Sequence, residues 1–283
     1  MAAVVFYSLE EQTIITREPR FFPPATDWRS QLGREVVGAC RNAGRAMLLL
    51  AEALLCIRYV LARRSRRETI HQMFVGGIKS LSVITVVASF TGMILALQTG
   101  IEMRRFGQEV YIGAAVMVSM LREMGPFMTG LILAASVGSA IAAQMGTMVV
   151  SEEIAALELM SINPVRYLVM PRLVAMMIMT PLLSFYSCIM GVVGGGIVGM
   201  TQLNVPWAAY IDNAIRFAAN KDLFVGMLKA FLFGMIIVIT ACHQGFATTQ
   251  GAVGVGNATR RTVILSFLSI LVVGYMITRF FYV

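Results

Sequence analysis

Five long stretches without a formally charged residue dominate the chain from residue 80 to its C-terminus, and they contain from 17 to 39 residues each. Within them apolar residues follow one another with little interruption, so neither the alternation of a half-buried strand nor the single stripe of a surface helix fits. A helix that crosses a membrane needs about 20 mostly apolar residues. The pattern therefore predicts five transmembrane helices, near 76–101, 110–146, 171–200, 224–246 and 262–281.

Composition supports a membrane protein. Hydrophobic residues make up 58% of the 283 residues and charged residues 13%, whereas a soluble domain carries about 25% charged residues. A soluble protein of this composition would have almost no polar surface. The net charge of +8 is concentrated toward the N-terminus, with Arg63, Arg64, Arg66 and Arg67 directly before the first span. Positive charge beside a first span favours the cytoplasm, which predicts a cytoplasmic N-terminus and, after five spans, a periplasmic C-terminus.

The N-terminal region divides into two predicted parts. Residues 1–32 contain three prolines among mixed charges and are expected to be irregular. Residues 33–67 are expected to form an amphipathic helix lying in the membrane interface, followed by the basic cytoplasmic segment. A sixth span is the alternative for this helix, but Arg45, Glu52 and Arg58 disfavour it. The polar stripe of the helix has spacings of seven, four and seven residues: Arg34, Arg41, Arg45 and Glu52.

Residues for catalysis or metal binding are scarce. The three lysines do not follow glycine, so no phosphate-binding GxxxxGK[ST] loop is present. His71 and His243 stand alone and the four cysteines lack CxxC spacing, which predicts no metal site and no nucleophile–base set. We therefore expect a transport subunit rather than an enzyme. If ATP drives it, another polypeptide must hydrolyse the ATP.

A short polar segment separates the second and third spans. Ser151 is a predicted N-cap, Glu152 and Glu153 would occupy the first turn, and Asn163-Pro164 would end the helix. So short a helix with this much apolar surface is poorly stable alone, so docking to a partner is favoured over a solvated loop helix. The residues expected on its apolar face are Ile154, Leu157, Met160 and Ser161.

Two adjacent charges interrupt the second span. Arg122 and Glu123 lie 13 and 14 residues after Glu109, which places them near the middle of the membrane. A charge there costs about 2.5–3.5 kcal/mol, so each should face the protein interior or a wet cavity. Adjacent helical residues do not face one another, and each charge therefore needs a partner on another helix or in a ligand. A structural ion pair and a functional pair beside a cavity, next to a kink at Gly125-Pro126, are both open.

Gly191, Gly195 and Gly199 form two overlapping GxxxG spacings in the third span. Such spacings let helices approach closely in lipid, either between subunits or within one chain. Residues 203–222 are expected to form an amphipathic connector at the outer interface.

Several ordered motifs resemble those of the MlaE/YrbE permease family over about residues 40–283. One departure is the segment Ser136–Ser139, where relatives often have an arginine before Gly-Ser. The motifs are Leu121–Pro126, Gly138–Ala140, Gly146–Met148, Glu152–Met160, Asn163–Arg166, Pro171–Arg172 and Ala258–Val263.

The resemblance implies an all-α integral membrane protein with an exporter-like ABC permease fold: an N-terminal elbow helix, five transmembrane helices in residues 68–283 and a cytoplasmic coupling helix. It implies a homodimer in the bacterial inner membrane that binds a cytoplasmic ATPase, which holds ATP-Mg, and a periplasmic MCE-domain protein. Such a system moves phospholipid or a related lipid between the inner membrane and the outer envelope. The chain itself is expected to need no cofactor. A secondary transporter of a hydrophobic substrate without an ATPase is the alternative.

The resemblance also suggests roles for individual residues. It places Arg122 and Glu123 beside the lipid pocket. For the apolar walls of that pocket we expect the end of the first span and the turn after it, with ordinary helix packing as the alternative for each residue: Met93, Leu97, Gln98, Ile101 and Phe106. The residues expected to couple to the ATPase are Glu152, Glu153, Ile154, Leu157, Glu158, Met160, Pro164 and Arg166.

Overall fold

The computed structural model describes residues 28–55 and 63–282, and the elements of these residues are all helical. The chain divides into a unit Met1–Arg45 and a unit Ala46–Val283, and the arrangement given below is that of the second unit. Helix α2 (Trp28–Leu55) runs through the division. It begins five residues earlier than the predicted start at residue 33. The remainder of the predicted extension, and residues 56–62 of the predicted interfacial segment, lie outside the described residues.

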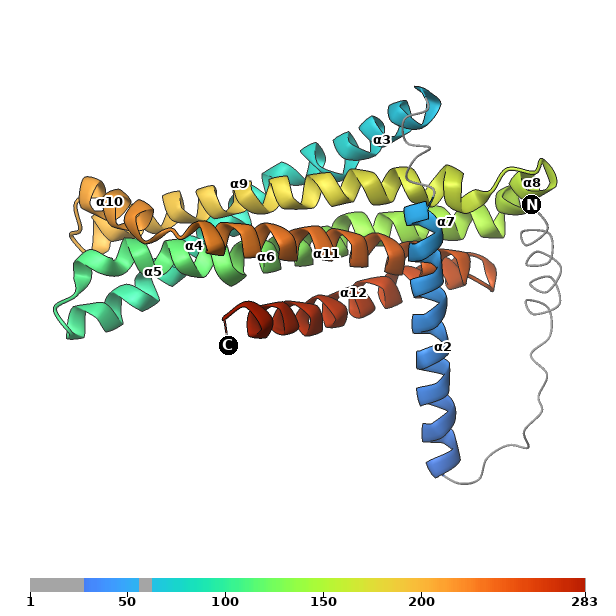
Figure 1. Ribbon diagram of the computed structural model, residues 1–283, viewed down its shortest axis with the longest axis horizontal. Helices are drawn as coiled ribbons and strands as arrows, with labels where there is room; N and C mark the ends of the chain where they lie inside the picture. The colour runs from blue at the N-terminus through green and yellow to red at the C-terminus, as the bar shows by residue number, and fades with distance from the viewer. Residues whose placement is uncertain (1–27, 56–62, 283) are drawn as a thin grey trace. The chain divides into compact units, whose positions relative to one another are not determined.

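Within the described ranges, five helical segments are long and apolar enough to cross a membrane, which confirms the predicted number of spans. Figure 1 shows them lying side by side along one direction. The first span joins α3 (Arg63–Gly76), the 3-10 turn η2 (Ile78–Ser80) and α4 (Leu81–Arg105). The third joins η6 (Val165–Val169) to α9 (Met170–Gln202), and the last two are α11 (Asn220–Phe246) and α12 (Gly251–Tyr282).

The second span is interrupted twice by π-helix. Its elements are η3 (Glu109–Tyr111), α5 (Ile112–Ser119), η4 (Met120–Met124), α6 (Gly125–Leu133), η5 (Ala134–Gly138) and α7 (Ser139–Val150). Both η4 and η5 have the wider π-helical hydrogen-bonding pattern. Short π segments of this kind occur often at functional sites, and η4 contains the two charges that the sequence singled out.

Close packing in the bundle depends on small residues where α4 meets α9. A Cβ atom on Gly92 would overlap the carbonyl of Gly191, and one on Gly194 would overlap the backbone of Ser89. Gly195 lies against the Tyr210 hydroxyl and the Gly92 carbonyl. The GxxxG face of the third span is therefore used inside one chain.

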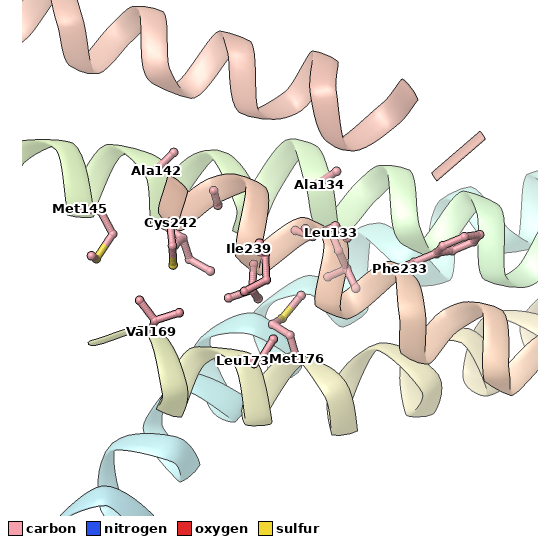
Figure 2. Packing of buried hydrophobic residues seen from close by; sticks show 14 of the residues in the cluster. Leu133, Ala134, Ala142, Met145, Val169, Leu173, Met176, Phe233, Ile239 and Cys242 are labelled. Atoms are coloured by element: carbon pink, nitrogen blue, oxygen red, sulfur yellow. The ribbon is translucent and has the colours of Figure 1, made fainter. Parts of the chain in front are cut away.

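Two apolar cores fill the bundle. One joins α6, α7, α9 and α11, and Figure 2 shows Leu133, Met145, Leu173 and Phe233 among its members. The other joins α4, α5 and α9 to α10 (Trp207–Phe217), the helix predicted as an amphipathic connector. Tyr210 of α10 is fully buried there and its hydroxyl donates to the Val192 carbonyl at 3.1 Å; burial raises the pKa of this phenol.

The large apolar side chains that remain exposed form rows along the spans. On α4 they recur every three or four residues, as they do on α9 and α12. A soluble protein would not leave rows of this length in water, whereas a bilayer covers them. The α4 row consists of Val83, Val86, Phe90, Ile94, Leu97 and Ile101.

Candidate functional site: a charged cluster inside the bundle

The local structure of η4 follows from Pro126. Proline has no N–H, so the carbonyl of Arg122, four residues earlier, loses its α-helical donor. The ammonium of Lys229 on α11 replaces that donor, with Nζ 2.7 Å from the Arg122 carbonyl oxygen. The N–H of Gly125 bonds to the carbonyl of Met120 in the π pattern. At the position where a kink was expected, the helix therefore has a π segment, and the Lys229 side chain of another helix bonds to its free carbonyl.

Arg122 is paired with an acid at the start of α11. Its Nε lies 2.8 Å from Oδ1 of Asp222, and the hydroxyl of Tyr282, at the end of α12, donates to the same oxygen at 2.6 Å. The guanidinium carbon lies 4.6 Å from the centroid of the Tyr282 ring, in the range of a cation–π interaction. Three helices meet at this pair.

Glu123 is paired with a base on the same face of α11. Lys229 Nζ lies 2.6 Å from Glu123 Oε1, and Thr278 of α12 donates to that oxygen at 2.6 Å. Thr278 Oγ1 also lies 2.7 Å from Lys229 Nζ. We call Arg122, Glu123, Asp222, Lys229, Thr278 and Tyr282 the charged cluster.

Sequence spacing explains how α11 and α12 reach η4. Asp222, Gly226 and Lys229 are four and three residues apart, so they share one helix face. Gly226 lies against the backbone carbonyl of Leu121, where a Cβ would overlap, and this contact brings α11 close to η4. Thr278 and Tyr282 are four residues apart on α12 and likewise share a face.

Burial divides the charged cluster into an inner and an outer half. The side chains of Asp222 and Lys229 are each 1% exposed, whereas those of Arg122 and Glu123 are 42% and 44% exposed. Each buried charge therefore has one half-exposed partner of opposite sign. Removing one member of a buried pair leaves an uncompensated charge and costs about 3–5 kcal/mol, so each buried group depends strongly on its partner.

The prediction that Arg122 and Glu123 need partners on other helices is confirmed, but the partners were not identified. In the sequence, Lys229 is one of the three lysines that do not follow glycine, and Asp222 falls in the predicted connector 203–222. The Asp222–Lys229 spacing of seven residues at the start of an apolar helix was the available signal. The cluster lies beside the first three turns of α11 and the C-terminal end of α12. Figure 1 shows that α12 ends part-way along the bundle, while α4, α5 and α10 lie beyond that end.

The predicted lipid-contacting residues of the first span do not join the charged cluster. The ion pairs of Arg122 and Glu123 in the described structure come from α11, with further contacts from α12. Met93 packs against the same apolar core as Leu121. Leu97, Gln98, Ile101 and Phe106 are exposed at the end of α4. A lipid-contacting role for these residues stays a prediction.

An apolar groove lies between the second span and α12. Its walls are apolar side chains of α6, η5 and α12: Leu131, Ala134, Val263, Ile264, Phe267 and Leu268. Because α12 also supplies Thr278 and Tyr282, one helix borders both the groove and the charged cluster. Among the described residues, no group of three or more His, Cys, Asp or Glu side chains could hold a metal ion.

The short helix between the second and third spans is α8 (Glu153–Leu159). The predicted N-cap, Ser151, is wrong: Glu152 occupies that position with φ of 59°, and Ser151 Oγ instead bonds to the Thr147 carbonyl at 2.9 Å. Only Glu153 therefore lies in the first turn. The turn from α7 into α8 is so tight that the cap residue takes a left-handed conformation.

The predicted apolar face of α8 is also partly wrong. Ile154 is buried, and Leu157 packs against the apolar core that joins α6, α7, α9 and α11 of the same chain. Leu159 and Met160, by contrast, are 87% and 62% exposed. Glu152, Glu153 and Glu158 are exposed beside them. The surface of α8 that is free to meet a partner is therefore acidic with an apolar tip, and Ile154 and Leu157 anchor the helix.

Asn163 begins the next helix instead of ending α8, which stops at Leu159. Its Oδ1 accepts from the backbone N–H groups of Val165 and Arg166 at 2.8 and 3.2 Å. Its Nδ2 donates to Glu52 of α2 at 2.8 Å. Pro164 is half-buried and Arg166 exposed within the same turn.

Comparison with known proteins agrees with this architecture. The family model described as permease MlaE matches residues 69–280. A probable ABC transporter permease protein of Rickettsia conorii is 40% identical over 213 residues, which cover 75% of this chain and 82% of the relative. The intermembrane phospholipid transport system permease protein MlaE of Haemophilus influenzae is 32% identical over 252 residues, covering 88% and 95%. The chloroplastic protein trigalactosyldiacylglycerol 1 of Arabidopsis thaliana is 32% identical over 216 residues, covering 76% and 62%. The chain is a multi-pass membrane protein that belongs to the MlaE permease family.

Proposed function

We propose that this chain is the permease subunit of an ATP-driven ABC transporter that moves phospholipid between the inner membrane and the outer envelope. The observation that carries the proposal is the charged cluster. It offers half-exposed charges inside a five-span apolar bundle, and the second span and α12, which contribute to it, also line an apolar groove farther along their length. A phospholipid combines a charged headgroup with two acyl chains and matches that combination. The similarity to the Rickettsia ABC transporter permease supports ATP-driven transport, and the similarity to the Haemophilus phospholipid transport permease supports a phospholipid substrate.

The proposed assembly contains two copies of this chain, a cytoplasmic ATPase subunit that holds ATP-Mg and a periplasmic MCE-domain protein. The acidic surface of α8, with Leu159 and Met160 at its tip, is the proposed ATPase contact. This orientation gives a cytoplasmic N-terminus and a periplasmic C-terminus. In this assembly the chain itself carries no cofactor and catalyses no reaction.

The ATPase contact can be tested by co-purification. Leu159→Ser should release the ATPase subunit from the affinity-purified chain, because it removes an exposed apolar side chain from the tip of α8. Ile215→Ser is the matched control, since Ile215 is 65% exposed on α10. Full retention of the ATPase by both Leu159→Ser and Met160→Ser would contradict the proposed contact. Lipid transfer that needs no nucleotide would instead favour a secondary transporter.

A further inference from the structure

The outer half of the charged cluster has hydrogen-bonding capacity left over. Arg122 Nε lies 2.8 Å from Asp222 Oδ1 in an ion pair that lacks hydrogen-bond geometry, and among the described residues its Nη1 and Nη2 have no hydrogen-bond partner either. Glu123 uses Oε1 for Lys229 and Thr278, and its Oε2 has no partner in the described part of the chain. Both side chains are nearly half exposed. The cluster therefore offers free N–H donors on a cation and a free acceptor oxygen on an anion.

The inner half fixes these two charges. Lys229 holds Glu123 from the buried side, and Asp222 with the Tyr282 hydroxyl holds Arg122. Each free group is therefore positioned by contacts from α11 and α12, with an oppositely charged side chain within 3 Å of it. A site of this kind is preorganised for a ligand that carries both signs.

The charged cluster is also electrically balanced. Two cations, Arg122 and Lys229, face two anions, Glu123 and Asp222, so its formal charge is zero. In a low-dielectric setting, a net-charged ligand would leave an uncompensated charge, whereas a net-neutral ligand would not. A further cation, Lys221, is exposed with its ammonium 5.1 Å from the Tyr282 ring centroid, and it takes no part in the two ion pairs of the cluster.

We propose that the charged cluster recognises a zwitterionic phospholipid headgroup, with its phosphate on the free Arg122 nitrogens and its ammonium on the free Glu123 oxygen. The inference rests on the proposed function and adds a headgroup class to it. A guanidinium binds phosphate through two parallel hydrogen bonds, and a carboxylate oxygen binds a primary ammonium through a charge-assisted one. Phosphatidylethanolamine has both groups. Phosphatidylglycerol has the phosphate but no cation, and phosphatidylcholine has a cation without an N–H donor.

Lipid competition on the purified full-length complex tests this assignment. The complex in detergent is given equimolar phosphatidylethanolamine and phosphatidylglycerol with identical acyl chains, and retained lipid is counted by mass spectrometry. We expect phosphatidylethanolamine to be retained about tenfold in excess, the factor that one additional charge-assisted hydrogen bond supports. Replacing it by phosphatidylcholine should lower the excess, because the N–H donors are gone. This comparison uses the unaltered protein and does not depend on the folding of a variant.

Two variants change the balance of charge in opposite directions. Glu123→Gln makes the cluster formally +1 and should shift retention toward phosphatidylglycerol. Arg122→Gln makes it −1 and should reduce phosphatidylglycerol retention most. Glu102→Gln is the matched control, because Glu102 is exposed and paired with Arg105 outside the cluster. Equal retention of both lipids by the unaltered complex overturns the headgroup assignment but leaves phospholipid transport standing. Retention of neither lipid overturns the proposed function and the assignment with it.

Discussion

The ammonium of Lys229 lies 2.7 Å from the backbone carbonyl oxygen of Arg122, the carbonyl that Pro126 deprives of its helical donor. The same ammonium lies 2.6 Å from Glu123. One buried side chain of α11 therefore donates to the carbonyl that lacks a helical partner in the second span, and it also neutralises the charge of Glu123. A rearrangement of η4 would disturb both contacts at once, which links the shape of the second span to the position of α11.

Lys229→Met should lower the free energy of unfolding by about 1–3 kcal/mol, because it leaves the Arg122 carbonyl without its donor and Glu123, which is half exposed, without its partner. Thermal unfolding of the purified protein in detergent measures the change. The double variant Lys229→Met with Glu123→Met should recover much of the loss, since neither charge then remains. Lys79→Met, at an exposed position, is the control and should have little effect. An unfolding temperature unchanged by Lys229→Met would show that the ammonium is not needed where the structure places it.

Tyr282→Phe removes the hydroxyl that donates to Asp222 but keeps the ring beside Arg122. A hydrogen bond to a charged group contributes about 1.5–3 kcal/mol, and Asp222 Oδ2 already has no partner among the described residues. We therefore expect a loss of stability of that size in the same unfolding assay. Tyr275→Phe, on an exposed part of α12, should be neutral. Equal effects of the two substitutions would argue against the Tyr282–Asp222 bond.

Gly92→Ala should disrupt the packing of α4 on α9, because its new methyl group would overlap the Gly191 carbonyl. Overpacking costs about 1–3 kcal/mol where neighbours can move, and a backbone carbonyl yields less readily than a side chain. Yield of folded protein after size-exclusion chromatography reports the effect. Gly256→Ala provides the control, since no atom lies within 4 Å of the added methyl. Normal yield of Gly92→Ala would mean that α4 and α9 are farther apart than described.

Asn163→Ala should weaken the connection between the start of the third span and α2, because Asn163 caps that span and also bonds to Glu52. Loss of such a cap costs about 1 kcal/mol, too little to unfold the protein. We therefore expect less lipid transferred per ATP hydrolysed while the ATPase stays bound. Glu52→Gln keeps an oxygen acceptor for Asn163 and should be milder. Identical transfer by Asn163→Ala and the unaltered protein would remove Asn163 from the coupling path.

Sequence reasoning succeeded where one chemical property decides the outcome. The number of spans follows from the length of uncharged stretches, and the need of Arg122 and Glu123 for partners on other helices follows from the cost of charge in a membrane. It failed where the outcome depends on which helices meet. The seven-residue spacing of Asp222 and Lys229 places both on one face of α11, but it does not show that this face meets η4 or that Lys229 bonds to the Arg122 carbonyl. Likewise, the apolar periodicity of α8 cannot distinguish Ile154 and Leu157, which anchor the helix, from Leu159 and Met160, which remain exposed.

ATP-dependent phospholipid transfer by the reconstituted complex tests the central claim most directly. Labelled phospholipid in proteoliposomes should reach the periplasmic acceptor protein, or leave it, only when ATP is hydrolysed. A non-hydrolysable nucleotide should stop the transfer, and Glu123→Gln should impair it while leaving the complex assembled. Transfer at the same rate with and without hydrolysable ATP would contradict the account.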